Sequence, residues 1–289
     1  MIISHIYGGL GNQMFQYAVG RALADKLGVA LKLDVTDFAC YPLRKYELDH
    51  LQINAEVAIT EEITKLRGSS DVWHKVIGVL RRQSRFPESF IQEKAYTFDQ
   101  SILMLGDQHY LKGYWQSEKY FPSITEQLRH EFQPITEPTE KNAEVIHNID
   151  QQQAISVHVR RGDYVQNAQT NAYHGTTSLD YYKKAAEHIM ASVRQPVFYV
   201  FSDDSEWVKA NLTFNAQTEY MTHNGPEKSH EDMRLMSRCK HHIIANSTFS
   251  WWGAWLGTNP GKIIIAPKQW FNQAGLDDRD LVPASWYRI

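Results

Sequence analysis

The chain has 289 residues, a formal net charge of -3 and two cysteines. This length is enough for two modest α/β domains or one large one, and either could bury a substantial core. The near-neutral charge gives no electrostatic footprint for nucleic acid, so nucleic acid is not an expected partner. Cys40 and Cys239 are too few for a disulfide framework, and no zinc-type spacing is present.

The amino-terminal residues predict a strand, a glycine-rich turn and a helix. Residues 2–6 are mostly apolar, residues 8–13 read Gly-Gly-Leu-Gly-Asn-Gln, and residues 14–27 carry apolar side chains at helical spacing. Free backbone N–H groups at a helix entrance suit an anion or sugar hydroxyls, although a purely structural turn would use the same glycines. The stretch lacks the Lys-Ser/Thr of a P-loop and the third glycine of a dinucleotide fingerprint. Asn12 and Gln13 at the helix entrance favour a binding role.

No apolar stretch at the start is long enough for a signal peptide or membrane anchor, so we expect a soluble protein, cytoplasmic or peripheral to a membrane.

The rest of the first half gives weaker patterns. Residues 30–33 predict a strand, and the pattern is then irregular to about residue 133. Within it, residues 73–85 predict a basic amphipathic helix that lies on an anionic membrane or packs on its own domain. Residues 110–120 predict a strand and turn, where Trp115 either stacks on a sugar or packs in the core.

Two prolines and mixed charge at residues 134–141 predict the join between two halves. We therefore expect domains over residues 1–135 and 136–289. The second half alternates strands and helices more clearly than the first.

The densest cluster of charge follows a strand predicted at residues 154–160. Its β-branched residues alternate with polar ones, so that His158 and Arg160 share one face. Arg161, Gly162 and Asp163 follow at the carboxyl end, where open α/β sheets bind their ligands. Two adjacent arginines suit a phosphate or carboxylate ligand, because a guanidinium binds such groups through two hydrogen bonds. The alternative is a solvated turn with an internal Arg-Asp ion pair.

Two more predicted strands end in polar residues. Residues 196–201 lead into Ser-Asp-Asp, and residues 242–245 lead into Asn-Ser-Thr-Phe-Ser before a helix at residues 251–256. Three polar strand ends at one sheet edge are typical of a doubly wound nucleotide-binding domain. Ser247, Thr248 and Ser250 offer hydroxyls to a phosphate there, or are only helix caps. The other predicted elements are helices at 178–193, with Ser178 as N-cap, and 230–239, and strands at 219–222 and 263–266.

Several of these stretches resemble motifs of the bacterial α-1,2-fucosyltransferases of glycosyltransferase family 11. They are Gly-Leu-Gly-Asn-Gln-Met-Phe-Gln-Tyr-Ala at residues 9–18, His-Val-Arg-Arg-Gly-Asp-Tyr at 158–164, Phe-Ser-Asp-Asp at 201–204, much of residues 232–256, and Ala-Pro at 266–267. The likeness spans nearly the whole chain in the right order. The arginine-containing stretch and Ser-Thr-Phe-Ser are specific, whereas Phe-Ser-Asp-Asp is weak.

The resemblance implies an α/β fold of GT-B type with two facing Rossmann-like domains. Residues 1–135 would bind mainly the acceptor, and residues 136–289 would bind the donor. The implied reaction is inverting transfer of L-fucose from GDP-β-L-fucose to the 2-hydroxyl of a terminal β-galactose, with no metal and no other cofactor. Arg160 would grip the diphosphate, His158 would help position the nucleotide and Asp232 would read the guanine. The other implied donor-binding residues are Gly11, Asn12, Gln13, Ser247, Thr248, Phe249 and Ser250.

The resemblance leaves the general base open. We expect a single displacement with an oxocarbenium-like transition state, in which Arg160 and a helix entrance stabilise the departing GDP without magnesium. Related transferases place a glutamate several residues beyond the arginine motif, but comparable positions here, such as Ala168, offer none. Asp163 and His174 are the candidates for the base. Asp163 is alternatively an ion-pair partner of a neighbouring arginine.

Two other functions stay open. One is a GDP-sugar transferase for a different sugar, because the sequence does not define the sugar pocket. The other is a non-catalytic glycan-binding protein, which would bind glycans without GDP. The family's habits imply a galactose-terminated oligosaccharide acceptor, either free or lipid-linked at the inner membrane face, for surface O-antigen. The basic helix at residues 73–85 is thin support for membrane contact.

Overall fold

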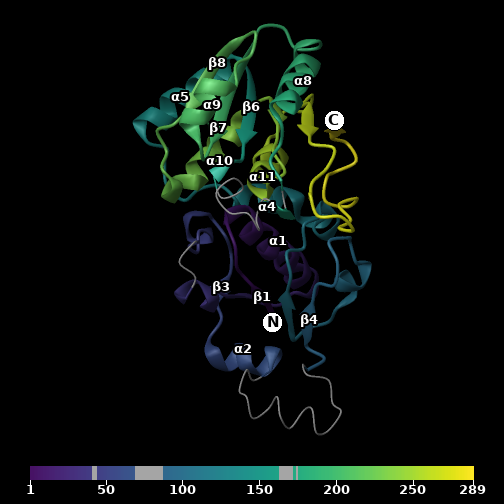
Figure 1. Cartoon of the computed structure of the whole chain (residues 1–289). Coiled ribbons are helices and arrows are strands. Elements are labelled where there is room, and N and C mark those ends of the chain that lie inside the picture. Colours follow the sequence, from purple (N-terminus) through teal and green to yellow (C-terminus); the bar gives the residue numbers. More distant parts are fainter. Residues whose placement is uncertain (41–43, 69–86, 163–171, 174) are drawn as a thin grey trace. The chain divides into compact units, whose positions relative to one another are not determined.

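In the computed structural model, the described residues are 1–40, 44–68, 87–162, 172–173 and 175–289. They form two compact units, Met1–Phe132 and Gln133–Ile289, and each unit has its own sheet. Both units are coloured along the chain in Figure 1. The helix predicted at residues 73–85 lies outside the described residues. Within the described ranges, no helix is long and apolar enough to cross a membrane.

The amino-terminal unit is built on a five-stranded parallel sheet with the order β3-β2-β1-β5-β4. The strands are β1 (Ile2–His5), β2 (Leu31–Asp34), β3 (Glu56–Val57), β4 (Phe90–Gln92) and β5 (His109–Lys112). The helices are α1 (Leu10–Leu27), α2 (Thr60–Arg67) and α4 (Thr125–Glu131), with short 3-10 turns at Thr36–Ala39, Leu48–His50, Gln100–Met104, Glu118–Tyr120 and Pro122–Ile124. Strands β2 and β3 lie on one side of β1, and strands β5 and β4 lie on its other side. The strand order therefore reverses between β1 and β5.

Helix α1 begins at Leu10, so the predicted start at residue 14 is wrong. Gly8 makes the turn before it with a φ of 82°, in the left-handed region that glycine adopts without steric penalty. Gly9 then serves as the N-cap, and its carbonyl accepts hydrogen bonds from the N–H groups of Asn12 and Gln13. The glycine turn is therefore shorter than predicted, because two glycines suffice to start the helix.

The carboxy-terminal unit is built on a six-stranded parallel sheet with the order β11-β10-β9-β6-β7-β8. The strands are β6 (Gln153–Val159), β7 (Pro196–Ser202), β8 (Gln217–Met221), β9 (His241–Ile243), β10 (Ile264–Ala266) and β11 (Tyr287–Arg288). The helices are α5 (Glu140–Gln151), α8 (Leu179–Met190), α9 (Ser205–Asn211), α10 (Ser229–Arg238) and α11 (Thr248–Leu256), with a 3-10 turn at Pro226–Lys228. Ser178 caps α8 as predicted, since its hydroxyl accepts from the Tyr181 N–H at 3.1 Å.

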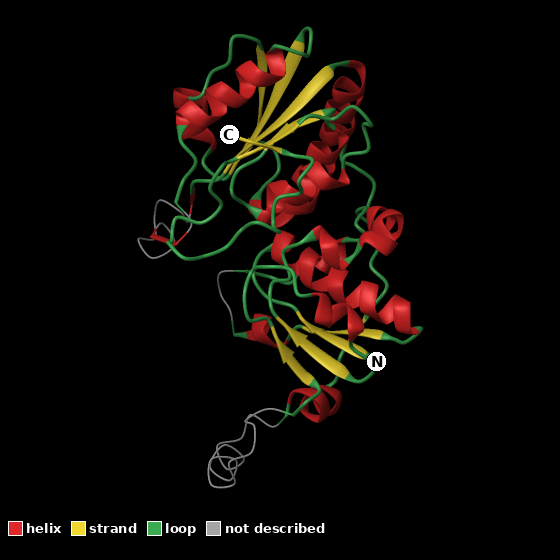
Figure 2. Cartoon of the chain, turned by 90° about the vertical axis from the view of Figure 1, so that its right-hand side faces the viewer, coloured by secondary structure: helices red, strands yellow, loops and turns green. Residues whose placement is uncertain are grey.

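Helices cover both faces of this sheet (Figure 2). On one face, Ile155 and Val157 of β6 pack with side chains of α8 and α9. On the other, Ala154 of β6 and Phe201 of β7 pack with side chains of α5 and α10. Burial on two faces explains why the strands read as apolar runs. The predicted α/β fold class is confirmed, because both units combine helices with a parallel sheet.

Candidate functional site

The centre of the carboxy-terminal sheet brings the three predicted polar strand ends to one edge. β6 lies between β9 and β7, and all three strands run parallel, so their carboxyl ends are neighbours. The chain adds β7 and β8 on one side of β6, then β9, β10 and β11 on the other. The strand order therefore reverses between β6 and β9, and doubly wound sheets bind their ligands at such a point. His158 and Arg160 stand at the end of β6, and Ser247 follows β9.

Arg160 is held by Asp203, which follows β7. Nη1 of Arg160 lies 2.9 Å from Oδ2 of Asp203, while Oδ1 accepts the Arg161 backbone N–H at 2.9 Å. Burial would raise the pKa of Asp203, but the Arg160 charge and the N–H groups of Arg161 and Gly162 outweigh it and lower that pKa. The carboxylate is thus ionised at neutral pH and fixes the turn. Arg160 keeps 19% of its side chain exposed, so a ligand can reach the guanidinium.

The neighbouring Arg161 is fixed by different contacts. Its Nε lies 3.4 Å from Oδ2 of Asp204, and its guanidinium carbon lies 3.5 Å from the centre of the Trp207 ring. Asp204 is also the N-cap of α9, because its Oδ1 accepts the Trp207 N–H at 3.3 Å. Arg161 is therefore engaged in packing at the start of α9. Both arginines pair with aspartates that follow β7, whereas the internal ion pair of the alternative would involve Asp163, which lies outside the described residues. Arg160 is the arginine better placed for an anion.

His158 is a buried, neutral imidazole beside Phe249. The side chain is 5% exposed, and its Nδ1 has no hydrogen-bond partner among the described residues. The ring centres of His158 and Phe249 are 5.4 Å apart. Burial lowers the pKa of His158 to about 4, with Asp203 opposing the shift and Arg160 adding to it. A neutral imidazole nitrogen without a protein partner is suited to a hydrogen bond with a bound molecule.

Helix α11 begins at Thr248, three residues before the predicted start, because Ser247 takes the N-cap position. The Ser247 side chain makes no capping hydrogen bond, so it does not satisfy the first N–H groups of the helix, an arrangement that favours anions. Phe249 packs against the core beneath α5 and α10. Ser250 is fully buried, and its hydroxyl donates to the carbonyls of Ser247 at 3.1 Å and Ala245 at 3.4 Å.

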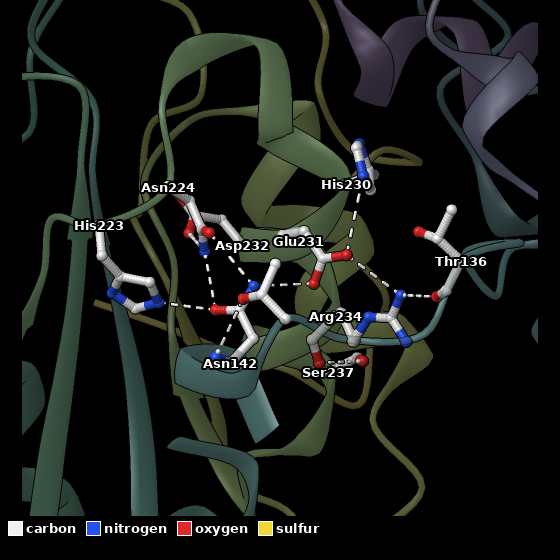
Figure 3. A network of polar contacts seen from close by, with 10 residues as sticks. Thr136, Asn142, His223, Asn224, His230, Glu231, Asp232, Arg234 and Ser237 are labelled. Carbon is white, nitrogen blue, oxygen red and sulfur yellow. Dashed lines mark hydrogen bonds and ion pairs between the residues drawn. The ribbon is translucent and has the colours of Figure 1, made fainter. Parts of the chain in front are cut away.

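Asp232 lies in the first turn of α10, within a network of polar contacts (Figure 3). Its Oδ1 accepts from Nδ2 of Asn224 at 2.8 Å. Burial raises the pKa of Asp232 to about 6, with the Asn224 hydrogen bond opposing the shift and the charge of Glu231 adding to it. The carboxyl group therefore titrates close to neutral pH, which is unusual for an aspartate and typical of functional sites.

Asn142 of α5 ties this network together. It is fully buried, and its Nδ2 donates to Oε2 of Glu231 at 2.9 Å and to Oδ1 of Asn224 at 3.2 Å. Its Oδ1 lies 2.6 Å from Nε2 of His223. Arg234 bonds Glu231 at 3.2 Å and also the Thr136 carbonyl (Figure 3). Asn142 of α5 and Arg234 thus fix the first turn of α10, which carries Asp232.

The sequence did not reveal the part played by Asn142. It pairs with Asn224 across 82 residues of chain, and no local pattern signals such a contact. Asp203 was visible as part of the polar end of its strand, but its hydrogen bonds to the turn after β6 could not be foreseen.

Gly11, Asn12 and Gln13 lie in the first turn of α1, in the amino-terminal unit. Gln13 is buried and ties loops together, since its Nε2 donates to the carbonyls of Gly8 at 2.9 Å and Lys45 at 2.8 Å. Oδ1 of Asn12 accepts from Nε2 of Gln116 at 2.9 Å. The donor contacts implied for these three residues stay predictions.

The two candidates for the general base, Asp163 and His174, lie outside the described residues. In the part of the chain that it describes, no group of three or more His, Cys, Asp or Glu side chains is arranged to hold a metal ion.

Comparison with known proteins identifies relatives along the whole chain. The family model described as glycosyl transferase family 11 matches residues 89–289. An α-1,2-colitosyltransferase of Escherichia coli is 35% identical over 297 residues, covering 100% of this chain and 99% of that protein. The E. coli O-antigen biosynthesis glycosyltransferase WbnK is 35% identical over 309 residues, covering 99% of each chain. The galactoside α-(1,2)-fucosyltransferase 1 of Lagothrix lagotricha is 28% identical, over 86% of this chain and 63% of its own length.

Among solved structures, a variant of Arabidopsis thaliana FUT1 in complex with GDP is similar. The superposition has a TM-score of 0.50 at 12% identity and covers 91% of this chain and 69% of that one. At this identity the likeness concerns the fold alone.

Proposed function

The chain belongs to glycosyltransferase family 11, and we propose that it transfers L-fucose from GDP-β-L-fucose to the 2-hydroxyl of a terminal β-galactose, with inversion. The observation that carries this proposal is the partly exposed Arg160, held by Asp203 where the strand order of the carboxy-terminal sheet reverses. Its galactoside α-(1,2)-fucosyltransferase relative supports the proposed donor sugar and linkage.

In this proposal the carboxy-terminal unit binds the GDP part of the donor. Arg160 and the first N–H groups of α11 meet the diphosphate, whose negative charge grows as the sugar leaves. His158 offers its unpaired nitrogen to the nucleotide. Ionised Asp232 accepts hydrogen bonds from N1 and the exocyclic amine of guanine. Removing one preorganised donor from such a site typically costs about 3–4 kcal/mol of transition-state stabilisation.

The proposed chemistry is a single displacement. The galactose 2-hydroxyl oxygen attacks the anomeric carbon while the bond from that carbon to the phosphate oxygen of GDP breaks. The electron pair of that bond leaves with GDP, which Arg160 stabilises, and the hydroxyl proton passes to a base. Asp163 and His174 remain the proposed candidates for that base, and no metal ion is proposed.

A second donor sugar is favoured by one observation. The E. coli α-1,2-colitosyltransferase matches the whole chain at 35% identity. Colitose differs from fucose by lacking one ring hydroxyl, so the same nucleotide site could serve either donor. A glycan-binding protein without activity is disfavoured, since it has no use for a partly exposed arginine at the point where the strand order reverses.

We propose a galactose-terminated oligosaccharide as the acceptor, in O-antigen synthesis. The support is the name of the E. coli relative WbnK, an O-antigen biosynthesis glycosyltransferase. A lipid-linked oligosaccharide at the inner membrane face would require peripheral contact with that membrane.

The test is to incubate the purified protein with lactose, with GDP-fucose or GDP-colitose, and with EDTA present. GDP release and formation of 2'-fucosyllactose or its colitosyl analogue are followed together. Fucosylated product in EDTA supports both the fucose donor and metal independence, whereas faster colitosyl transfer would reassign the donor. If neither GDP-sugar binds, the proposed function is wrong.

A further inference from the structure

The loop that follows β5 has an unusual backbone. Trp115 has a φ of 57°, in the left-handed region that residues with a side chain rarely adopt. At Gly113, an added Cβ would lie 2.4 Å from Cβ of Glu93 and 2.8 Å from Cε2 of Trp115, so only glycine fits. The loop is therefore packed tightly against Glu93.

Glu93 holds this conformation with both of its carboxylate oxygens. Oε2 accepts the Tyr114 N–H at 2.7 Å, and Oε1 accepts the Trp115 N–H at 2.9 Å. Burial raises the pKa of Glu93, although these two hydrogen bonds oppose the shift. Gln116 then joins the loop to the start of α1 through its 2.9 Å hydrogen bond to Asn12.

As a result, the neighbouring residues Tyr114 and Trp115 differ in burial. Trp115 is 2% exposed and contacts Tyr120 edge to face, so it packs in the core and the sugar-stacking alternative for it is wrong. Tyr114 stays half-buried. Its ring centre lies 4.9 Å from that of Tyr7 and 6.2 Å from that of Tyr96, with the last pair stacked. We call Tyr7, Tyr96 and Tyr114 the tyrosine cluster.

The tyrosine cluster lies where the strand order of the amino-terminal sheet reverses. Tyr7 follows β1 and Tyr114 follows β5, and these parallel neighbours flank the reversal point. This is the position at which open α/β sheets bind ligands. The Tyr7 hydroxyl makes no hydrogen bond to the described residues, and it feels the charges of Glu93 and Asp37, which help to raise its pKa after burial and Tyr114.

The chemistry of the cluster suits a neutral, hydroxyl-rich ring. Tyrosine rings offer apolar faces with a polar edge. The carboxylate of Asp37 is 55% exposed, with its Oδ2 2.9 Å from Nε2 of His5, so it can accept hydrogen bonds from hydroxyls. The negative charges of Asp37 and Glu93 disfavour a phosphate at the same place.

We propose that the tyrosine cluster binds the galactose ring of the acceptor, and that Glu93 is the positioning residue that turns Tyr114 toward it. This inference rests on the proposed function, whose acceptor site it names. It predicts that changes in the cluster alter acceptor use without altering donor binding.

The first variant is Tyr114→Ala, which keeps both backbone N–H groups that Glu93 binds. We expect the KM for lactose to rise about tenfold, corresponding to the loss of one ring contact, with the Kd for GDP unchanged. Tyr114→Phe, which keeps the ring, should stay close to the wild type. An unchanged KM for lactose in a folded Tyr114→Ala protein would overturn the proposal.

The second variant is Glu93→Gln, which places an amide donor against one of the two loop N–H groups. A matched control is Glu88→Gln, since Glu88 is exposed in the same unit and the charge change is identical. We expect Glu93→Gln to raise the KM for lactose and Glu88→Gln to leave that KM at the wild-type value. If the kcat falls and the KM does not, Glu93 has no positioning role for the acceptor.

A binding measurement separates this inference from the proposed function. Saturation-transfer NMR with methyl β-galactoside reports contact of the sugar with the protein and requires no transfer. Contact that is lost in Tyr114→Ala supports the cluster as a galactose site even if no fucose is transferred. Equal contact in the wild type and Tyr114→Ala would reject the site even if the enzyme transfers fucose.

Discussion

At the scale of single residues, two aspartates carry the electrostatics of the proposed donor site, and their pKa values move in opposite directions. Asp203 faces Arg160 and two backbone N–H groups, so its charged form is stabilised. Asp232 is half-buried beside Glu231 with one amide partner, so its charged form is destabilised. Asp203 is therefore suited to a fixed structural role. Asp232 is suited to a role in which hydrogen bonds from a ligand stabilise its charged form.

We expect Asp203→Asn to weaken both the fold and GDP binding. The ionised carboxylate stabilises the fold at pH values above the unfolded-state pKa of an aspartate, about 3.9. This stabilisation is lost as the pH falls through the lower pKa of Asp203 in the folded state. Because Asp203 is 26% exposed, the loss on mutation should be about 1–3 kcal/mol. Urea unfolding and GDP titration at pH 7 measure the two effects. The control is Asp180→Asn, whose carboxylate is 70% exposed, and wild-type GDP affinity in Asp203→Asn would contradict the assignment.

The affinity for GDP should fall as the pH drops through 6. The pKa of Asp232 is raised to about 6, and only the ionised carboxylate accepts both guanine N–H groups. One pH unit below the pKa only about a tenth of the molecules are ionised, so the Kd should rise about tenfold at pH 5. Calorimetric titration between pH 5 and 8 checks this. Asp232→Asn should bind weakly with a flat pH profile, and an equally steep profile in this variant would place the titrating group elsewhere.

At the scale of elements, the proposed donor site depends on how α10 packs on α11. Gly253 of α11 faces Met236 of α10, and an added Cβ at Gly253 would lie 2.6 Å from the methionine Cε and 3.0 Å from its Cβ. The two helix backbones therefore approach closely at this point. Asp232 lies on α10 and the proposed phosphate-binding N–H groups lie on α11, so this contact sets their spacing.

Gly253→Ala should destabilise the protein by about 1–3 kcal/mol and weaken GDP binding, because the extra methyl group overpacks the helix contact. Met236→Ala in the same chain should restore part of the GDP affinity by making room. The matched control is Gly261→Ala, since an added Cβ at Gly261 meets nothing within 4 Å. Thermal unfolding and GDP titration are measured for the wild type, Gly253→Ala, the double variant with Met236→Ala, and Gly261→Ala. Equal effects of the two glycine variants would show that the close approach of Gly253 to Met236 does not matter.

Local patterns predicted the elements that hold the donor motifs. β6, β7 and α8 lie within a few residues of their predicted bounds, because long apolar periods and a serine cap are properties of adjacent residues. The short strands β3 and β4 were missed, since two or three residues show no period. The orientation of Trp115 was not predictable either, because it follows from the contact with Glu93, 22 residues earlier in the chain.

At the scale of the whole molecule, the two units repeat one topological plan. Each has a parallel sheet whose first strand stands beside a reversal of strand order. In the carboxy-terminal unit that point carries Arg160 and His158, with Asp203 beside them. In the amino-terminal unit it carries tyrosines and carboxylates. One plan thus carries the proposed anion site in one unit and the proposed sugar site in the other.

This division predicts that the carboxy-terminal unit, residues 133–289, folds and binds GDP by itself. It contains a complete sheet and buried clusters on both faces, which are the requirements for independent folding. His158, Arg160 and Asp232 all belong to it, so its Kd for GDP should lie within about tenfold of the full chain, with no sugar transfer. Thermal unfolding followed by circular dichroism establishes folding, and titration with GDP and UDP establishes binding and base selectivity. A cooperatively folded unit that does not bind GDP would show that the amino-terminal unit contributes most of the donor site. Gly11, Asn12 and Gln13 would then be the first residues to test.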